Sequence, residues 1–338
     1  MSLIRAWAAK QPKGKLEPFE YDPGPLAAED VEIAVEHCGI CHSDLSVIDN
    51  EWMNTKYPMV PGHEVIGRVT ALGSAAKGLE VGQRVGVGWN AGSCMHCRPC
   101  LSGDQHLCPT AQATILGHYG GFADRMRAHW AWAIPIPEGL STAEAGPLLC
   151  GGVTVFSPLM LNDIRPTDSV GIVGIGGLGH MALKFCRAWG CEVTAFTSSE
   201  SKADEARSFG AHKVLSSRDS SAIRAAADSL DCVIVTVNVP LDWPAIVGTL
   251  KGNGTLHVVG AVLEPIPVSA FDLIGRQRKV TGSPTGSPVR IATMLEFATR
   301  HQVLPQTEHY PLEEVNAALD RLRSGKARYR IVLDMPKS

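Results

Sequence analysis

Two short segments in the first third of the chain carry side chains that together could hold a metal ion. The segment CGICHSD contains Cys41 and Ser43, and the segment GHE contains His63 and Glu64. A thiolate and an imidazole are the mixed sulfur and nitrogen ligands that zinc prefers. Ser43 would bring a hydroxyl beside a substrate oxygen at that metal, and Glu64 would be a movable carboxylate ligand. One Cys and one His are more often a buried thiol and a hydrogen-bonded ring, so the metal site depends on further ligands.

A third thiol, Cys150, stands in the motif GPLLCGG, where we expect a helix to begin. With Cys41 and His63 it gives two thiolates and one imidazole around an open fourth position, which is typical of catalytic zinc. Alone, Cys150 would be interpreted as a small buried apolar side chain.

A separate cluster of four cysteines has the spacing C-x2-C-x2-C-x7-C. Four thiolates so close on one loop can close a tetrahedral site with no open position, which defines a structural zinc. Ferredoxin-like iron–sulfur sites share the first part of this spacing but continue differently, so zinc is favoured. His96 and His106 are expected to be bystanders, because four sulfurs already fill the site. The expected ligands are Cys94, Cys97, Cys100 and Cys108.

Composition limits the classes of function that are open. The 338 residues are enough for about two domains. The net charge of −3 gives no basic excess for nucleic acid, and no apolar run approaches the ~18 residues that span a bilayer. The N-terminus lacks the apolar core of a signal peptide. Ten cysteines without an export signal favour metal binding in a reducing cytoplasm over disulfides.

Residues 1–150 have the pattern of an all-β domain. The stretches Val31–Val35, Val65–Val69 and Val85–Val87 predict short strands, separated by turns rich in Gly and Pro. We expect a partly open barrel or sandwich, with the four-cysteine loop (94–108) as a lobe.

Residues 151–285 have the alternating pattern of a dinucleotide-binding domain. Val170–Val173 is typical of a buried parallel strand, and His180–Trp189 of a helix. Between them lies G-x-G-x-x-G, in the context where backbone N–H groups approach a pyrophosphate. Further strands (192–196, 232–237 and 256–260) and helices (219–230 and 243–250) predict a doubly wound parallel sheet. The expected loop residues are Gly174, Gly176, Gly177, Leu178 and Gly179.

The end of the strand at 192–196 selects the coenzyme. NAD enzymes place an acid there for the ribose 2′-hydroxyl. This chain has Ser198, Ser199 and Lys202 instead, which could hold the 2′-phosphate of NADP(H). Glu200 is the counter-argument, because a strand that ended two residues later would make it the acid of an NAD site. NADP(H) is favoured, and NAD stays open.

The last segment, 286–338, contains two expected helices (289–301 and 312–324) and a final strand (328–333), and we expect it to return to the first domain. The spacing Cys38-x-x-Cys41 is not interpreted as a redox motif, because it does not open a helix in a βαβ unit. The cysteines expected to be core thiols are Cys38, Cys186, Cys191 and Cys232.

Together these residues resemble the zinc-dependent alcohol dehydrogenases of the medium-chain dehydrogenase/reductase superfamily, over essentially the whole chain. The motifs that carry the resemblance are GICHSD, NEW (50–52), KYPMVPGHE (56–64), the four-cysteine lobe, PLLCGG and the loop Gly174–His180. The branch that it resembles is the cinnamyl-alcohol-dehydrogenase type, which includes bacterial and cyanobacterial NADPH-dependent aldehyde reductases. The resemblance implies an α/β plus β architecture: a GroES-like catalytic domain with an inserted Rossmann domain.

The resemblance also implies roles for individual residues. Catalytic zinc would be held by Cys41, His63 and Cys150, with Glu64 able to exchange into its shell. Ser43 would hand a proton to or from the reacting oxygen. Two residues, Trp52 and Trp89, match the aromatic walls of the substrate pocket. The remaining positions expected at the coenzyme site are His42, Thr154, Thr236, Val259, Val262 and Ser283.

One position departs from the family pattern. Many relatives carry a His five residues after the first zinc cysteine, where it relays the proton to solvent, and here that position is Ser46. A serine can pass a proton through water but does not titrate near neutral pH. The relay is therefore in doubt, and a weaker dependence of turnover on pH is expected.

By this resemblance the chain is an NADP-dependent zinc alcohol dehydrogenase that interconverts aldehydes and primary alcohols, aromatic or medium-chain. Zinc would polarise the carbonyl, NADPH would deliver hydride, and Ser43 would help to protonate the product. The expected partners are the small-molecule substrate and a second copy of the chain, in the cytoplasm, with no nucleic acid and no membrane. The alternatives are a related zinc enzyme that uses NAD or polyols, a zinc-free quinone reductase, and an NADPH-binding redox sensor without turnover.

Overall fold

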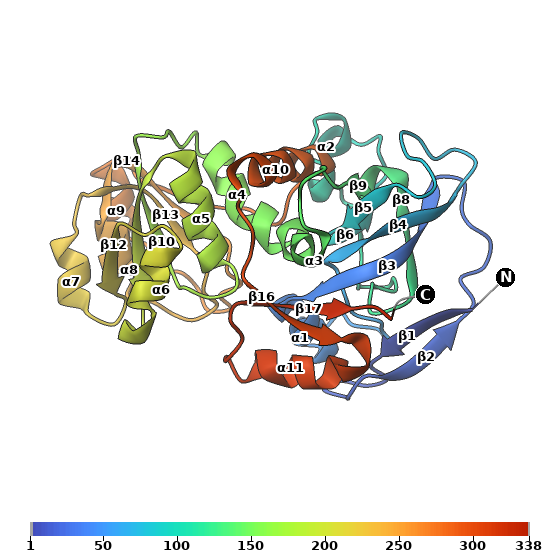
Figure 1. Cartoon of the computed structure of the whole chain (residues 1–338). Helices are drawn as coiled ribbons and strands as arrows, with labels where there is room; N and C mark the ends of the chain where they lie inside the picture. The colour runs from blue at the N-terminus through green and yellow to red at the C-terminus, as the bar shows by residue number, and fades with distance from the viewer. Residues whose placement is uncertain (1–2, 337–338) are drawn as a thin grey trace. The chain divides into compact units, whose positions relative to one another are not determined.

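A seven-stranded sheet and a six-stranded parallel sheet are the centres of two separate units of the chain. The structure, a computed structural model, describes residues 3–336. Unit one comprises the residues up to Val153 and those from Thr285 onward, and unit two comprises Thr154–Pro284. Most helices and strands of the two units are labelled in Figure 1.

The large sheet of unit one is mostly antiparallel, in the order β16-β17-β3-β4-β5-β9, and β8 also pairs with β3. Its central strand, β3 (Asp30–Ile40), runs beyond the alternation at 31–35. An irregularity between Val35 and His37 explains the difference, because the register shift breaks the period of two. The other strands are β1 (Ile4–Ala8), β2 (Glu17–Tyr21), β4 (Val65–Leu72), β5 (Arg84–Val87), β6 (Asn90–Gly92), β7 (Gln112–Ala113), β8 (Arg125–His129), β9 (Ile134–Pro135), β16 (Thr307–Pro311) and β17 (Arg330–Asp334).

The C-terminal segment belongs to this same sheet. Strand β17 pairs antiparallel with β3, with Ile331 opposite Ile40, and Figure 1 shows the red strand beside the blue one. This pairing brings Arg330 next to the segment that carries Cys41. The helices of unit one are α1 (His42–Ile48), α2 (Arg98–Leu101), α3 (Thr142–Ala145), α10 (Pro288–His301) and α11 (Val315–Arg323), and α4 (Gly151–Leu161) begins at its boundary.

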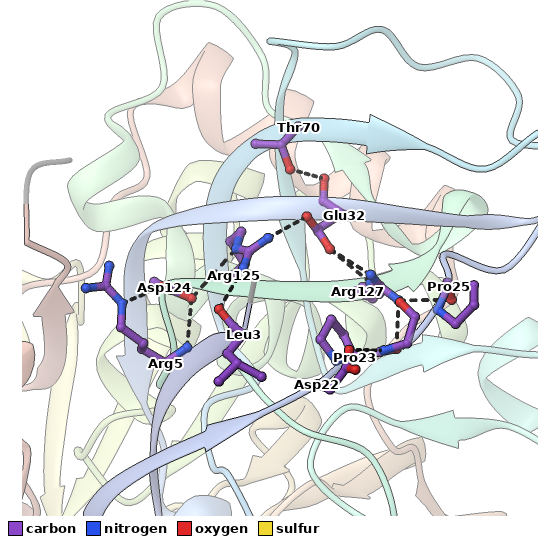
Figure 2. A network of polar contacts seen from close by, with 11 residues as sticks. Leu3, Arg5, Asp22, Pro23, Pro25, Glu32, Thr70, Asp124, Arg125 and Arg127 are labelled. Atoms are coloured by element: carbon purple, nitrogen blue, oxygen red, sulfur yellow. Dashed lines mark hydrogen bonds and ion pairs between the residues drawn. The ribbon is translucent and has the colours of Figure 1, made fainter. Parts of the chain in front are cut away.

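A network of arginines and acids ties β3 and β8 to the N-terminal segment (Figure 2). Glu32, which is 9% exposed, pairs with Arg125 at 3.0 Å and Arg127 at 2.9 Å. Arg127 also donates to the carbonyl oxygens of Pro23, Gly24 and Pro25 at 2.9–3.1 Å. The side chains of Glu32, Arg125 and Arg127 are at most 21% exposed, so the carboxylate depends largely on the two arginines for its hydrogen bonds.

Unit two is built on a parallel sheet in the order β12-β11-β10-β13-β14-β15. Strands and helices alternate along the chain, as in a doubly wound domain. Helix α5 packs on β10 and β11, and Figure 1 labels α5 and β10. The elements are β10 (Ser169–Val173), α5 (Gly179–Trp189), β11 (Glu192–Thr197), α6 (Ala203–Ser208), β12 (Lys213–Ser216), α7 (Ser220–Ala225), β13 (Leu230–Val235), α8 (Trp243–Gly248), β14 (Leu250–Val258), α9 (Ala270–Ile274) and β15 (Lys279–Gly282).

One expected helix of unit two differs from the structure at its C-terminal end. The helix expected at 219–230 was too long, because α7 ends at Ala225, Asp228 has a left-handed φ of 53° and Leu230 already begins β13. The expected core thiols, in both units, are buried: Cys38, Cys186, Cys191 and Cys232.

Within residues 3–336, no single helix is long and apolar enough to cross a membrane, although one bent pair, Thr142–Leu149 with Gly151–Leu161, meets those criteria together.

Candidate functional site

Four side chains from three separate segments of unit one meet in a buried cluster. The ligand atoms of Cys41, His63, Glu64 and Cys150 all lie within 4.8 Å of one another. Cys41 precedes α1 where β3 ends, His63 and Glu64 precede β4, and Cys150 precedes α4. The sequence expectation that these four residues come together therefore agrees with the geometry.

Asp44 fixes the orientation of this cluster. Its carboxylate accepts hydrogen bonds from the backbone N–H groups of Cys41 at 2.8 Å and Gly62 at 2.9 Å. It also lies 3.0 Å from Nδ1 of His63. With Nδ1 engaged by a carboxylate, Nε2 of His63 is the nitrogen left to bind a metal. Asp44 had no predicted role, although its place three residues after Cys41, on the first turn of a helix, is a signal for such a contact.

Two buried polar atoms of the cluster lack hydrogen-bond partners within residues 3–336, which shows whether the cluster fits a metal ion. Among the described residues, neither Nε2 of His63 nor Oε2 of Glu64 has a hydrogen-bond partner, and both side chains are fully buried. Buried polar atoms without partners are costly. Two thiols, an imidazole and a carboxylate are also the donor set of a zinc site with three firm ligands. The residues fit a zinc ion.

Arg330 is the counter-charge of the cluster. Its guanidinium, 5% exposed, forms an ion pair with Glu64. The hydrogen bond from the Cys150 thiol, together with Arg330, lowers the pKa of Cys41 well below its ordinary value and outweighs burial. The same hydrogen bond raises the pKa of Cys150. Burial raises the pKa of Glu64 to about 7, although Arg330 opposes this. One thiol is thus ready to be a thiolate, and a bound cation would release the proton of the other.

The hydroxyls expected near the metal lie on α1. The Ser43 hydroxyl, half-buried, is 3.8 Å from the Cys41 sulfur, which puts it within reach of a ligand at the metal. Ser46 is only 4% exposed, so its hydroxyl does not face bulk solvent. His42, the first residue of the helix, is exposed.

Two indole rings lie beside the buried cluster. The ring of Trp89 packs edge-on against His63, with centroids 5.0 Å apart, and Trp52 packs against Trp89 at 5.9 Å. Both indoles are half-buried. The structure therefore places the two expected wall residues together and next to His63.

The second cluster is the four-cysteine loop. The sulfur of Cys94 lies 3.9 Å from that of Cys100 and 3.6 Å from that of Cys108, and all four sulfurs lie within 4.8 Å of one another. Tetrahedral zinc with sulfurs at ~2.3 Å requires sulfur–sulfur distances of about 3.7 Å, so the loop fits the ion. Burial raises the pKa of Cys108, but hydrogen bonds from Thr110 and Cys94 bring it down to about 6. Neither His96 nor His106 belongs to the cluster.

The glycine-rich loop of unit two joins β10 to α5. Gly174 has a left-handed φ of 93°, and a side chain there would collide with Val237. At Gly176 a Cβ would meet nothing within 4 Å, which leaves space for a ligand over the loop. Gly179 packs against the Gly174 carbonyl at the start of α5. These are the three glycine roles of a dinucleotide loop, with Gly177 and Leu178 between them.

Strand β11 ends at Thr197, so Ser198 and Ser199 follow its tip directly. Lys202 donates from Nζ to the carbonyl oxygen of Ile175 at 2.9 Å, which holds the ammonium group beside the glycine-rich loop. Glu200 begins a short 3-10 turn, Glu200–Lys202, beyond the strand. The geometry gathers hydroxyls and an ammonium group where a 2′-phosphate would bind.

The other coenzyme positions are spread over unit two. The Thr236 hydroxyl donates to the carbonyl oxygens of Val173 and Gly174 at 2.9 Å, so it braces the loop. Val259 follows β14, and Val262 packs against the core. Thr154 is 8% exposed. Ser283 follows β15 and lies 2.9 Å from Nε2 of His257, a contact that the sequence did not reveal.

Two family models match the chain. An alcohol dehydrogenase GroES-like domain matches residues 27–138, and a zinc-binding dehydrogenase domain matches residues 177–300. The first match covers the segments that carry Cys41, His63 and the four-cysteine loop, and the second covers most of the residues expected at the coenzyme site.

Curated relatives match over nearly the whole length. The chain is 52% identical over 336 residues to "Aldehyde reductase AdhA" of Synechocystis sp.. The alignment covers 99% of this chain and 100% of the relative. It is 40% identical over 338 residues to "Cinnamyl alcohol dehydrogenase 2" of Rauvolfia serpentina. That alignment covers 97% of this chain and 94% of the relative.

Solved structures show the same likeness. A cinnamyl alcohol dehydrogenase from Sorghum bicolor superposes with a TM-score of 0.94 at 38% identity, over 98% of both chains. A cinnamyl alcohol dehydrogenase (CAD) from Helicobacter pylori, complexed with NADP(H), superposes with a TM-score of 0.91 at 30% identity, over 99% of both chains.

Proposed function

This chain belongs to the cinnamyl-alcohol-dehydrogenase-like branch of the zinc-dependent medium-chain alcohol dehydrogenases, and we propose that it reduces aldehydes to primary alcohols with NADPH. The buried cluster of Cys41, His63, Glu64 and Cys150 carries the proposal. The relatives named aldehyde reductase and cinnamyl alcohol dehydrogenase, and the NADP(H) complex of a structural neighbour, support the reaction and the coenzyme.

The residues in and around the cluster have separate roles in the proposed reaction. When bound, zinc supplies Lewis acidity toward a carbonyl oxygen, and NADPH supplies the hydride. Cys41, His63 and Cys150 would hold the metal ion, and Glu64 lies close enough to replace one of its ligands. The Ser43 hydroxyl gives a proton to the product oxygen or takes one from an alcohol. Since Ser43 is half-buried, this proton transfer takes place away from bulk solvent.

The coenzyme residues act by position and charge. The loop around Gly176 leaves room for a pyrophosphate at the start of α5, where backbone N–H groups and the helix dipole favour an anion. Ser198, Ser199 and Lys202 offer donors to the 2′-phosphate. Glu200 lies past the tip of β11, which supports NADP(H) over NAD.

The substrate class follows from the wall beside His63. Trp52 and Trp89 present apolar ring surface close to the metal ligands. Such surface favours an aromatic aldehyde, by offset or edge-to-face ring contacts, over a polyol that would need hydrogen-bond partners.

We also propose a homodimer in a reducing cytoplasm. Among the described strands, β15 pairs only with β14, and exposed apolar side chains lie on it and on the preceding α9: Phe271 (85% exposed), Ile274 (73%) and Val280 (40%). An unpaired edge beside apolar surface is typical of an interface. Sedimentation analysis should find a dimer that Val280→Lys weakens. All ten cysteines are free thiols, which thiolate metal sites require.

The cluster assignment is tested with Cys150→Ser, and Cys191→Ser is the matched control because that thiol is buried outside both clusters. We expect Cys150→Ser to lose the catalytic zinc and aldehyde reduction while it keeps the structural zinc. Cys191→Ser should keep both ions. Wild-type activity and zinc content in Cys150→Ser would contradict the assignment.

A further inference from the structure

A buried histidine of unit two lies outside both metal clusters. His257, on β14, is 1% exposed, and both of its ring nitrogens are engaged. Nδ1 lies 3.0 Å from Nδ2 of Asn162 and 2.9 Å from the Thr281 hydroxyl. Nε2 lies 2.9 Å from the Ser283 hydroxyl. The ring therefore connects the residue after α4 with the residue after β15.

Asn162 determines which ring nitrogen carries the hydrogen. Its Nδ2 also donates to the Pro158 carbonyl oxygen at 2.9 Å. The amide cannot be turned around, because its oxygen would then face that carbonyl. An amide nitrogen only donates, so Nδ1 of His257 accepts and Nε2 carries the hydrogen. Burial lowers the pKa of His257 to about 4, which keeps the ring neutral at neutral pH.

This tautomer decides what the Ser283 hydroxyl can do. Because Nε2–H of His257 donates to the serine oxygen, the hydroxyl hydrogen is left to donate to another group. Ser283 is half-buried and directly follows Gly282, the last residue of β15. It therefore stands at the carboxyl edge of the parallel sheet, outside which such sheets bind their ligands.

The strand order indicates which part of a ligand Ser283 would meet. The pyrophosphate loop follows β10, and the 2′-phosphate residues follow β11 on one side of it. The strand order reverses between β10 and β13, and a dinucleotide lies across such a reversal. The half made by β13, β14 and β15 is then left for the nicotinamide nucleotide, whose carboxamide oxygen is a hydrogen-bond acceptor.

We propose that His257, held by Asn162, is a positioning residue that orients the Ser283 hydroxyl as a donor to the carboxamide oxygen of the nicotinamide coenzyme. The inference rests on the proposed function, because it needs a nicotinamide coenzyme in unit two. His257 itself touches no reacting atom.

The first test measures the dissociation constants of NADPH and of 2′,5′-ADP, which lacks the nicotinamide half. Ser283→Ala and His257→Leu should each weaken NADPH binding by about 3- to 15-fold, the effect of one hydrogen bond. The double variant should be no weaker than either single one, because the two side chains act in one chain of contacts. His257→Gln, whose amide can still donate to Ser283, should recover part of the affinity. Binding of 2′,5′-ADP should not change in any of them.

The second test reads the tautomer directly. In the wild type, the ¹⁵N chemical shifts of His257, assigned by comparison with His257→Gln, should show hydrogen on Nε2. Asn162→Asp puts an acceptor beside Nδ1 and should move the hydrogen there. Nε2 would then accept from Ser283, and NADPH binding should weaken although Asn162 is not proposed to touch the coenzyme.

Each other outcome overturns a specific claim. Hydrogen on Nδ1 in the wild type would overturn the inference. So would NADPH binding within twofold of wild type in both His257→Leu and Asn162→Asp, provided that 2′,5′-ADP binding is retained. Failure of the wild type to bind either nucleotide would overturn the proposed function and the inference with it.

Discussion

Replacing Asp44 with Asn should weaken the catalytic zinc and leave the structural zinc unchanged. The carboxylate accepts three hydrogen bonds, from the backbone of Cys41 at 2.8 Å, the backbone of Gly62 at 2.9 Å and the His63 ring at 3.0 Å. The two oxygens share these donors, and the Asn amide can offer only one oxygen. Its NH2 group must then face at least one buried N–H.

The magnitude follows from these contacts. Loss of a carboxylate that orients a metal-binding histidine weakens metal affinity by about 10- to 100-fold, or roughly 1.4–2.7 kcal/mol. A buried donor left without a partner costs a further 1–3 kcal/mol or so of folding stability. We therefore expect Asp44→Asn to have both weaker zinc binding and a lower free energy of unfolding.

The assay is zinc release to a chromophoric chelator of known affinity, followed per chain. The wild type should release two classes of zinc, and in Asp44→Asn only one class should move, to chelator concentrations about 10- to 100-fold lower. Asp204→Asn is the control, because the Asp204 side chain is 99% exposed. A folded Asp44→Asn variant that releases both classes as the wild type does would refute the reasoning.

Three further predictions concern other parts of the chain. Arg127→Ala removes two hydrogen bonds to Glu32, which keeps Arg125 as a donor, and the shared donor of three carbonyls. Urea unfolding should therefore show a loss of about 1–3 kcal/mol, against less than about 1 kcal/mol for the exposed Arg207→Ala. Equal losses would contradict the network's role. Buried His257 has a pKa of about 4 in the folded protein, so between pH 6.5 and pH 4 only the unfolded chain binds a proton at this ring. The free energy of unfolding therefore falls as the pH falls, and His257→Gln should lessen that fall by up to roughly 3 kcal/mol. An unchanged fall in the variant would sink this explanation. Ser46→His puts a group that titrates near neutrality into α1, so the pH profile of turnover should gain an inflection there; a profile like that of the wild type would count against the relay position.

The spacing of residues along the chain was enough to predict contacts between residues that are close in sequence. The four cysteines between residues 94 and 108 lie on one loop, so their cluster follows from their spacing. The glycine-rich loop follows from a strand, three glycines and a helix in sequence. In both cases the chain between the residues is too short to separate them.

Contacts between distant segments could not be predicted in the same way. Arg330 reaches Glu64 only because β17 pairs with β3, and no local pattern encodes that pairing. Asn162 and His257 are likewise brought together by the sheet of unit two. For Cys41, His63 and Cys150, the resemblance supplied what spacing alone could not.

The most direct test of the central claim is the initial rate of cinnamaldehyde reduction by the zinc-loaded protein, with NADPH and NADH compared at equal concentration. We predict reduction with both zinc sites filled, and a faster rate with NADPH. A faster rate with NADH would overturn the roles of Ser198, Ser199 and Lys202. No reduction of cinnamaldehyde or benzaldehyde with either coenzyme, in a protein that holds both zinc ions, would contradict the proposed function.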